Sequence, residues 1–92
     1  MAEPAAIVVE LPAALVRLFP GATRQVELHA RDVGAVLAAL DARWPGMRDR
    51  LCDARPAIRR HIVVFVDGER ATLATPLRPG AEVLVTTAMS GG

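Results

Sequence analysis

One amphipathic helix near the middle of the chain most constrains the fold. After Asp32, apolar residues recur at spacings of three and four and so fall in one stripe along a helix: Val33, Val36, Leu37, Leu40 and Trp44. Asp32 is a good N-cap, and the pair Pro45-Gly46 stops the helix. A single apolar stripe must be buried against another layer, and the rest of the chain is strand-like. The sequence therefore predicts a two-layer α+β domain with one main helix on one face of a sheet.

Two strand-like segments precede this helix. Residues 6–11 form a β-branched run with little polarity, which is typical of a strand covered on both faces or nearly so. In residues 23–30, apolar and polar residues alternate, and Val26, Leu28 and Ala30 share one face of a half-exposed strand. We expect these two strands to form an antiparallel hairpin with a long loop.

Two further strand-like segments follow the helix. Residues 61–66 are the most strand-like of the chain, and Asp67-Gly68 after them is a strong tight-turn signal. Residues 82–87 give the last strand, with Val83 and Val85 on one face. If the first and last strands pair in the middle of the sheet, the helix packs on one face. The β-grasp (ubiquitin-like) arrangement, with a mixed sheet of four to five strands, satisfies this order.

The connecting segments carry weaker signals. Residues 13–19 are apolar but unpatterned, and we expect a connection that carries Leu15, Leu18 and Phe19 into the core rather than a stable helix. Met47 and Leu51 lie four apart, which predicts one further helical turn on the domain's edge. Residues 55–60 are interpreted as an exposed basic connector.

Length and charge exclude several classes of partner. A chain of 92 residues with a formal net charge of +1 fits one small domain and lacks the dense basic stripe that nucleic acid or an anionic membrane requires. No apolar run approaches the roughly 20 residues that span a bilayer, and Met1-Ala2-Glu3-Pro4 lacks the basic start of a secretory signal. A single cysteine agrees with a reducing compartment. We therefore predict a cytoplasmic protein.

No constellation of side chains predicts an active site. His29, His61 and Cys52 lack the close spacing that metal sites use, so no metal is expected. No acid and base couple and no phosphate-binding glycine loop stand out, so the chain is not expected to be an enzyme or to bind a cofactor. The large side chains Trp44, Phe65 and Phe19 are assigned to the core.

The end of the chain is the candidate site. Residues 1–87 are predicted to form the domain, and residues 88–92 a flexible tail that ends in Gly91-Gly92. Glycines suit a narrow channel because they have no Cβ, so an ATP-using enzyme could adenylate the Gly92 carboxylate. Ser90 and Met89 would enter the channel of that partner enzyme together with the two glycines. Leu84 and Thr86, opposite Val83 and Val85 on the last strand, are the expected docking surface, although Leu84 could equally be second-layer core.

The sequence resembles the ubiquitin-like sulfur carriers of the MoaD/ThiS family, which includes the small subunit of molybdopterin synthase and the carriers of thiamine and cysteine biosynthesis. The resemblance spans nearly the whole chain and is carried by AVLAALDARWPGMRDRL, VVFVDGE, TPLRPGAEVLV and Gly91-Gly92. Many relatives have a proline and a larger apolar residue where this chain has Thr87 and Thr86. The length of residues 47–60 favours the molybdopterin or cysteine type.

The resemblance implies a β-grasp fold and a sulfur carrier. An E1-like enzyme would adenylate Gly92 with ATP, and the product would become a thiocarboxylate that donates sulfur to an accepting synthase. Two alternatives remain open: a ubiquitin-like modifier conjugated through Gly92, and a non-catalytic β-grasp interaction module. Because all 11 basic residues are arginine, the chain has no lysine ε-amine and could enter a conjugate only as the donor.

Overall fold

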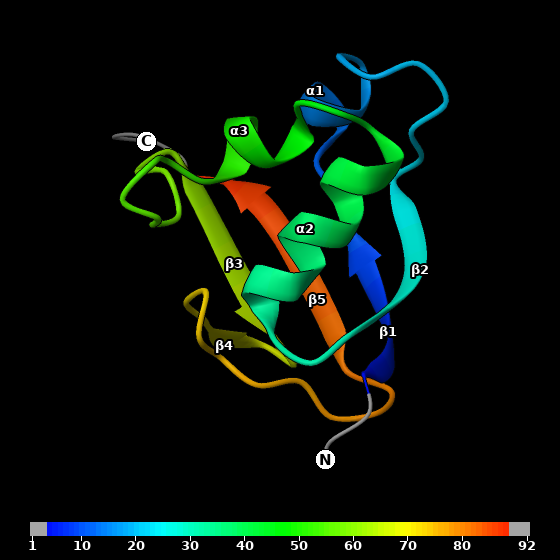
Figure 1. The fold of residues 1–92 in the computed structure, drawn as a ribbon, viewed down its shortest axis with the longest axis vertical. Helices are drawn as coiled ribbons and strands as arrows, with labels where there is room; N and C mark the ends of the chain where they lie inside the picture. The colour runs from blue at the N-terminus through cyan, green and yellow to red at the C-terminus, as the bar shows by residue number, and fades with distance from the viewer. Residues whose placement is uncertain (1–3, 89–92) are drawn as a thin grey trace.

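The computed structural model describes residues 4–88 (Figure 1). The fold consists of a five-stranded mixed sheet and the helices that cover one of its faces. The strands are β1 (Ala5–Glu10), β2 (Gln25–Ala30), β3 (Ile62–Val66), β4 (Glu69–Arg70) and β5 (Glu82–Thr87). The helices are α1 (Ala13–Val16), α2 (Val33–Arg43) and α3 (Met47–Leu51). This confirms the predicted α+β class and the β-grasp arrangement.

The two terminal strands of the chain pair at the centre of the sheet. The strand order is β2-β1-β5-β3-β4, with β1 parallel to β5 and the other pairs antiparallel. The predicted hairpin of β1 and β2 is present and runs from the pair Ala5↔Ala30 to the pair Glu10↔Gln25. β5 is therefore paired with β1 over its first three residues, Glu82 to Leu84, and with β3 from Val83 to Thr87, where the chain leaves the sheet.

Helix α2 follows the sequence pattern closely. Its N-cap, Asp32, accepts a hydrogen bond from the backbone N–H of Ala35 at 2.8 Å, and four residues of the predicted stripe are buried: Val33, Val36, Leu37 and Leu40. Trp44 lies one residue beyond the helix, where its backbone N–H donates to the Leu40 carbonyl. Its half-buried side chain packs against the core. Pro45 cannot continue the helix, so the ladder ends there.

Residues 13–19 contain a single helical turn, where the sequence predicts only a connection. Leu15 is buried with 6% of its surface exposed, and Phe19 is partly buried against the core. Leu18 is 52% exposed, so the expectation that it enters the core was wrong. One turn of helix can present only one side to the core, and Leu15 occupies that side.

Helix α3 contributes more to the core than its sequence indicates. Met47 and Leu51, expected on the domain's edge, are 0% and 1% exposed. Gly46 has φ +98, a left-handed conformation that lets the chain turn sharply after α2. This turn brings α3 back against α2, and the two apolar residues fill the space between helix and sheet.

Strand β1 is covered on one face only, so the prediction that it is covered on both faces or nearly so was wrong. Along that strand Ala5, Ile7 and Val9 are buried, whereas Ala6 and Glu10 are exposed. The strand is central but is covered on one face only, because α2 and α3 lie on the same side of the sheet (Figure 1). None of the helices within residues 4–88 is long and apolar enough to cross a membrane.

A pair of leucine substitutions tests this core. Leu40→Ala should lower the free energy of unfolding by about 2 to 5 kcal/mol, because Leu40 is 0% exposed and its loss leaves a cavity. Leu18→Ala, the same change at an exposed position, should cost no more than about 0.5 kcal/mol. Urea unfolding followed by circular dichroism measures both. Equal costs would contradict the assignment of the two leucines.

Candidate functional site

The last backbone hydrogen bond of the described chain marks the exit from the sheet. The N–H of Ala88 donates to the carbonyl of His61 at 2.8 Å, which prolongs the pairing of β5 with β3 by one residue. The predicted tail residues Met89, Ser90, Gly91 and Gly92 lie outside the described residues. Four residues can span at most about 14 Å, so a group that reacts with the terminal carboxylate must approach this end of β5 within that distance.

The strand that leads to this exit presents two predicted docking residues on the uncovered face. Leu84 is 39% exposed, and Thr86 is half-buried. In the sheet register Leu84 lies between Glu10 of β1 and Phe65 of β3, and Thr86 is paired with Val63. No second layer of residues 4–88 covers Leu84, so the alternative that it is second-layer core is wrong. The docking role itself stays a prediction.

Phe65 joins this face, and its assignment to the core was wrong. The run His61 to Val66 is apolar at almost every position, so no alternation reveals which side chains face the helix. The pairing decides it: Val64 and Val66 face the helix layer with Val85 and Val83, and Phe65 pairs with Leu84 on the other side. Trp44 and Phe19, in contrast, pack against the core as expected.

An open hollow lies on the uncovered face, with an apolar centre and a charged rim. Val8, Phe65 and Leu84 supply the centre, and Glu10, Glu82 and Arg78 are part of the rim. Asp67 organises one side, since its carboxylate accepts the backbone N–H of Glu82 at 3.0 Å and contacts the Arg78 guanidinium at 3.5 Å. An exposed apolar patch rimmed by polar groups is typical of a protein interaction site.

The titratable side chains do not converge. His29 and His61 are exposed at the sheet, and Cys52 is buried, with its Sγ 3.3 Å from the Asp53 carbonyl. Within residues 4–88 no group of three potential metal ligands comes together. The two histidines and the cysteine are thus spread over the fold, as their spacing in the sequence suggests, and the described strand that precedes the tail carries the exposed apolar patch.

Asp53 is the acid with the clearest perturbation, and it organises the loop before β3. The Arg55 guanidinium donates to its carboxylate, as do the backbone N–H groups of Arg55 and Ala57. These hydrogen bonds, led by the one from the Arg55 side chain, lower the pKa of Asp53 from 3.8 to about 2. The carboxylate thus holds the first half of the loop, residues 53–57, and the loop itself leads to His61 at the exit of the chain.

A protein-family comparison decides the identity of the chain, because the ThiS family model matches residues 9–92. The chain belongs to the ThiS family. The match covers the last strand and the terminal residues Gly91-Gly92 as well as the helix layer. The predicted resemblance to ubiquitin-like sulfur carriers is confirmed. Members of this family are small carrier proteins rather than catalysts.

Solved structures place the ThiS-family chain among β-grasp proteins. CysO from Mycobacterium tuberculosis is 26% identical with a TM-score of 0.80, and covers 90% of this chain and 99% of its own. SAMP1 from Haloferax volcanii is 26% identical with a TM-score of 0.78, over 96% of this chain and all of its own. A chain of the Amycolatopsis orientalis BexX/CysO complex, at 24% identity, a TM-score of 0.82 and coverage of 95% and 100%, supports the fold. No curated protein gave a significant sequence match.

The Asp53 carboxylate gives a test of the loop beside the exit. Because the pKa of Asp53 is lowered to about 2 on folding, its contribution to stability is present above the ordinary pKa of 3.8 and is lost as the pH falls toward 2. A carboxyl-detected NMR titration should therefore give Asp53 a midpoint near pH 2. Asp53→Asn should remove the loss of stability over that pH range. An Asp53 midpoint close to the ordinary value would contradict the hydrogen bonds described here.

Proposed function

We propose that this chain carries sulfur on the carboxylate of Gly92. An E1-like enzyme joins that carboxylate to the α-phosphate of ATP, which gives an acyl-adenylate and releases pyrophosphate. Attack by hydrosulfide displaces AMP and leaves a thiocarboxylate. Attack by a persulfide gives an acyl disulfide, which a thiol then reduces to the same thiocarboxylate.

The match of the ThiS family through residue 92 is the observation that carries this proposal. The fold adds a geometric reason. β5 is paired with β3 up to Thr87, and Ala88 prolongs that pairing, so the exit at Ala88 is in a fixed place relative to Leu84 and Phe65. An enzyme that docks on the uncovered face can therefore position its adenylation site at a reproducible distance from the exit. The chain supplies the acyl group, and the activating enzyme supplies the catalytic side chains and binds ATP.

The sulfur acceptor belongs to the same proposal. Thiocarboxylate sulfur would pass to a synthase of molybdopterin, cysteine or thiamine biosynthesis, and the chain would act there as a co-substrate or as the small subunit of the complex. The similarity to CysO, at 26% identity, is compatible with any of these acceptors. We expect these reactions to take place in the cytoplasm.

Protein modification is the second candidate, and one observation favours it. Haloferax volcanii small archaeal modifier protein 1 is 26% identical to this chain, and the match covers 88% of this chain and 94% of the modifier. In this reaction the acyl-adenylate reacts, directly or through a thioester, with a lysine amine of a target. The chain has no lysine, so it cannot form a branched polymer with itself through side chains.

Intact-mass measurement tests the carrier proposal. After incubation with a cognate E1-like enzyme, ATP and a sulfur donor, the full chain should gain about 16 Da, the mass change when sulfur replaces one oxygen. A variant that lacks Gly92 should show neither this gain nor ATP-pyrophosphate exchange. Exchange without the mass gain, together with tryptic peptides in which Ala71–Gly92 is joined to a lysine of another protein, would favour the modifier. A full chain that is never adenylated would contradict both.

The docking surface has its own test. Leu84→Glu places a charge at the centre of the apolar patch and should lower the rate of Gly92 adenylation at subsaturating carrier by about tenfold, since interface residues that matter cost more than about 1 kcal/mol when changed. Leu18→Glu makes the same change at an exposed leucine on another part of the domain and should leave the rate within about twofold. Thermal melts of both variants check the fold. Equal rates for the two variants would remove Leu84 from the docking surface.

A further inference from the structure

The outer edge of β3 is paired along only half of its length. β4 pairs with Phe65 and Val66, and the next residue, Ala71, donates its N–H to the Val64 carbonyl at 2.8 Å. The chain then turns away toward the start of α2, where the Leu73 carbonyl accepts the Gly34 N–H at 2.9 Å. Within residues 4–88 no strand lies beside the outer edge of residues 62–64.

Two backbone groups on this edge have no hydrogen-bond partner in the described part of the chain. Alternate residues of a strand direct their N–H and C=O groups to the same side, so Ile62 shares the outer side with Val64. The Ile62 N–H donates to the Arg59 carbonyl, and the Val64 carbonyl accepts from Ala71. The Ile62 carbonyl and the Val64 N–H are the two groups left without a hydrogen-bond partner in residues 4–88. They flank Val63, and one residue of an added parallel strand could pair with both.

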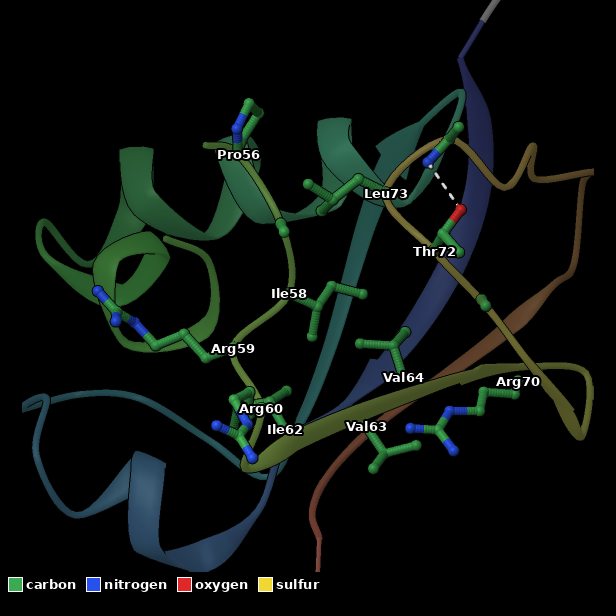
Figure 2. Close-up of a pocket in the computed structure, with 13 residues that line it drawn as sticks. Pro56, Ile58, Arg59, Arg60, Ile62, Val63, Val64, Arg70, Thr72 and Leu73 are labelled. Carbon is green, nitrogen blue, oxygen red and sulfur yellow. Dashed lines mark hydrogen bonds between the residues drawn. The ribbon is translucent and has the colours of Figure 1, made fainter. Parts of the chain in front are cut away.

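A groove with aliphatic walls and basic residues along it runs beside this edge. It has a volume of about 500 Å³ and lies between residues 56–60 and residues 70–74. Figure 2 shows Ile58 and Leu73 on the same side of β3 as Val64, where they form the walls above the strand. Both walls also pack against the core, so the groove is part of the folded domain.

The charged side chains that line the groove are all basic. Three arginines, Arg59, Arg60 and Arg70, lie along it, and none of its lining residues is acidic. In Figure 2, Arg70 and Val63 extend from the side of β3 opposite to Ile58 and Leu73. The Arg59 side chain donates to the Asp49 carbonyl, and Arg60 and Arg70 are exposed and make no ion pair within residues 4–88. These two guanidinium groups are available to a carboxylate of a bound segment.

We propose that the outer edge of β3 binds an extended segment of a partner protein, in parallel orientation, with alternating aliphatic and acidic side chains. The residue that pairs with Val63 turns its side chain to the face that carries Val63 and Arg70, where a carboxylate meets the arginines. Its two neighbours turn to the other face and enter the groove between Ile58 and Leu73, where aliphatic side chains fit. Strand addition of this kind takes affinity from backbone hydrogen bonds and specificity from alternate side chains.

This surface is separate from the reaction proposed for Gly92. It lies along the edge of β3 that faces away from β5, so a segment bound there leaves the exit at Ala88 accessible. It needs neither ATP nor acyl transfer. If the edge of β3 does not bind such a segment, the proposed carrier function is unaffected. If Gly92 is not adenylated, the proposal for the edge of β3 is likewise unaffected.

A blocked heptapeptide of alternating glutamate and valine is the probe. Titrated into the full ¹⁵N-labelled chain, it should shift the amide signals of residues 58–64 and 70–73 with saturation, and should slow hydrogen exchange of the Val64 N–H at least tenfold. The matched control replaces every glutamate of the peptide by lysine and should bind at least about tenfold more weakly. No saturable shift, or shifts confined to β2 or to Leu84 and its neighbours, would overturn the proposal.

Charge reversal in the protein provides the second arm. The double variant Arg60→Glu and Arg70→Glu should weaken binding of the glutamate peptide about tenfold and strengthen binding of the lysine peptide. The control double variant, Arg17→Glu and Arg31→Glu, should change the affinity for either peptide by no more than about twofold. If the double variant does not fold, Ala74→Trp, which fills the groove from an exposed position, should cause the same loss. Dimers of the free chain that protect Val64 would assign the edge to a second copy and overturn the proposal.

Discussion

The parallel pairing of β1 with β5 is the interaction on which the rest of the structure depends. It joins the two ends of the domain at the centre of the sheet, where Val9 and Val83 are paired and are 0% and 1% exposed. Parallel strands cannot be joined by a tight turn, so the chain between them must cross over, and helix α2 packs on one face of the sheet as part of that crossover. With a single helical layer available, one face is buried and the other stays open. The pairing thus places β5 at the middle of the sheet, with the uncovered face beside it.

Function in this fold follows from position rather than from reactive side chains. The exit of the chain is fixed by the pairing of β5 with β3 up to Thr87 and by the last bond, from the Ala88 N–H to the His61 carbonyl. Leu84 and Phe65 form an apolar centre on the uncovered face, and Asp53 and its hydrogen bonds order the loop that ends at His61. The proposed strand-addition edge lies on the far side of β3. A carrier that must visit an activating enzyme and then an acceptor would benefit from surfaces that can be used independently, since occupation of one leaves the other accessible.

Much of this was predictable because the signals are local. The stripe of α2, its Asp32 cap, the alternation of β2 and the Asp67-Gly68 turn each depend on residues within a few positions of one another, and all four are found in the structure. The errors fall where burial depends on a distant neighbour. Leu18 and Phe65 are large and apolar, yet both point away from the core. Met47 and Leu51, which appeared peripheral, fill the core because Gly46 turns α3 back onto α2.

The sequence by itself determined the class of fold, the single main helix and the family resemblance, which includes the motif Gly91-Gly92. These features are encoded in periodicity, in turn residues and in the terminal motif, which need no partner in space. Only the tertiary structure decided which face of the sheet stays open, that Phe65 pairs with Leu84 on that face, and that the edge of β3 at Ile62 and Val64 lacks a neighbouring strand in residues 4–88. The physical reason is that register and layer order are set by contacts between residues far apart in the chain, and an apolar run such as residues 62–66 is compatible with either face until its partners are in place.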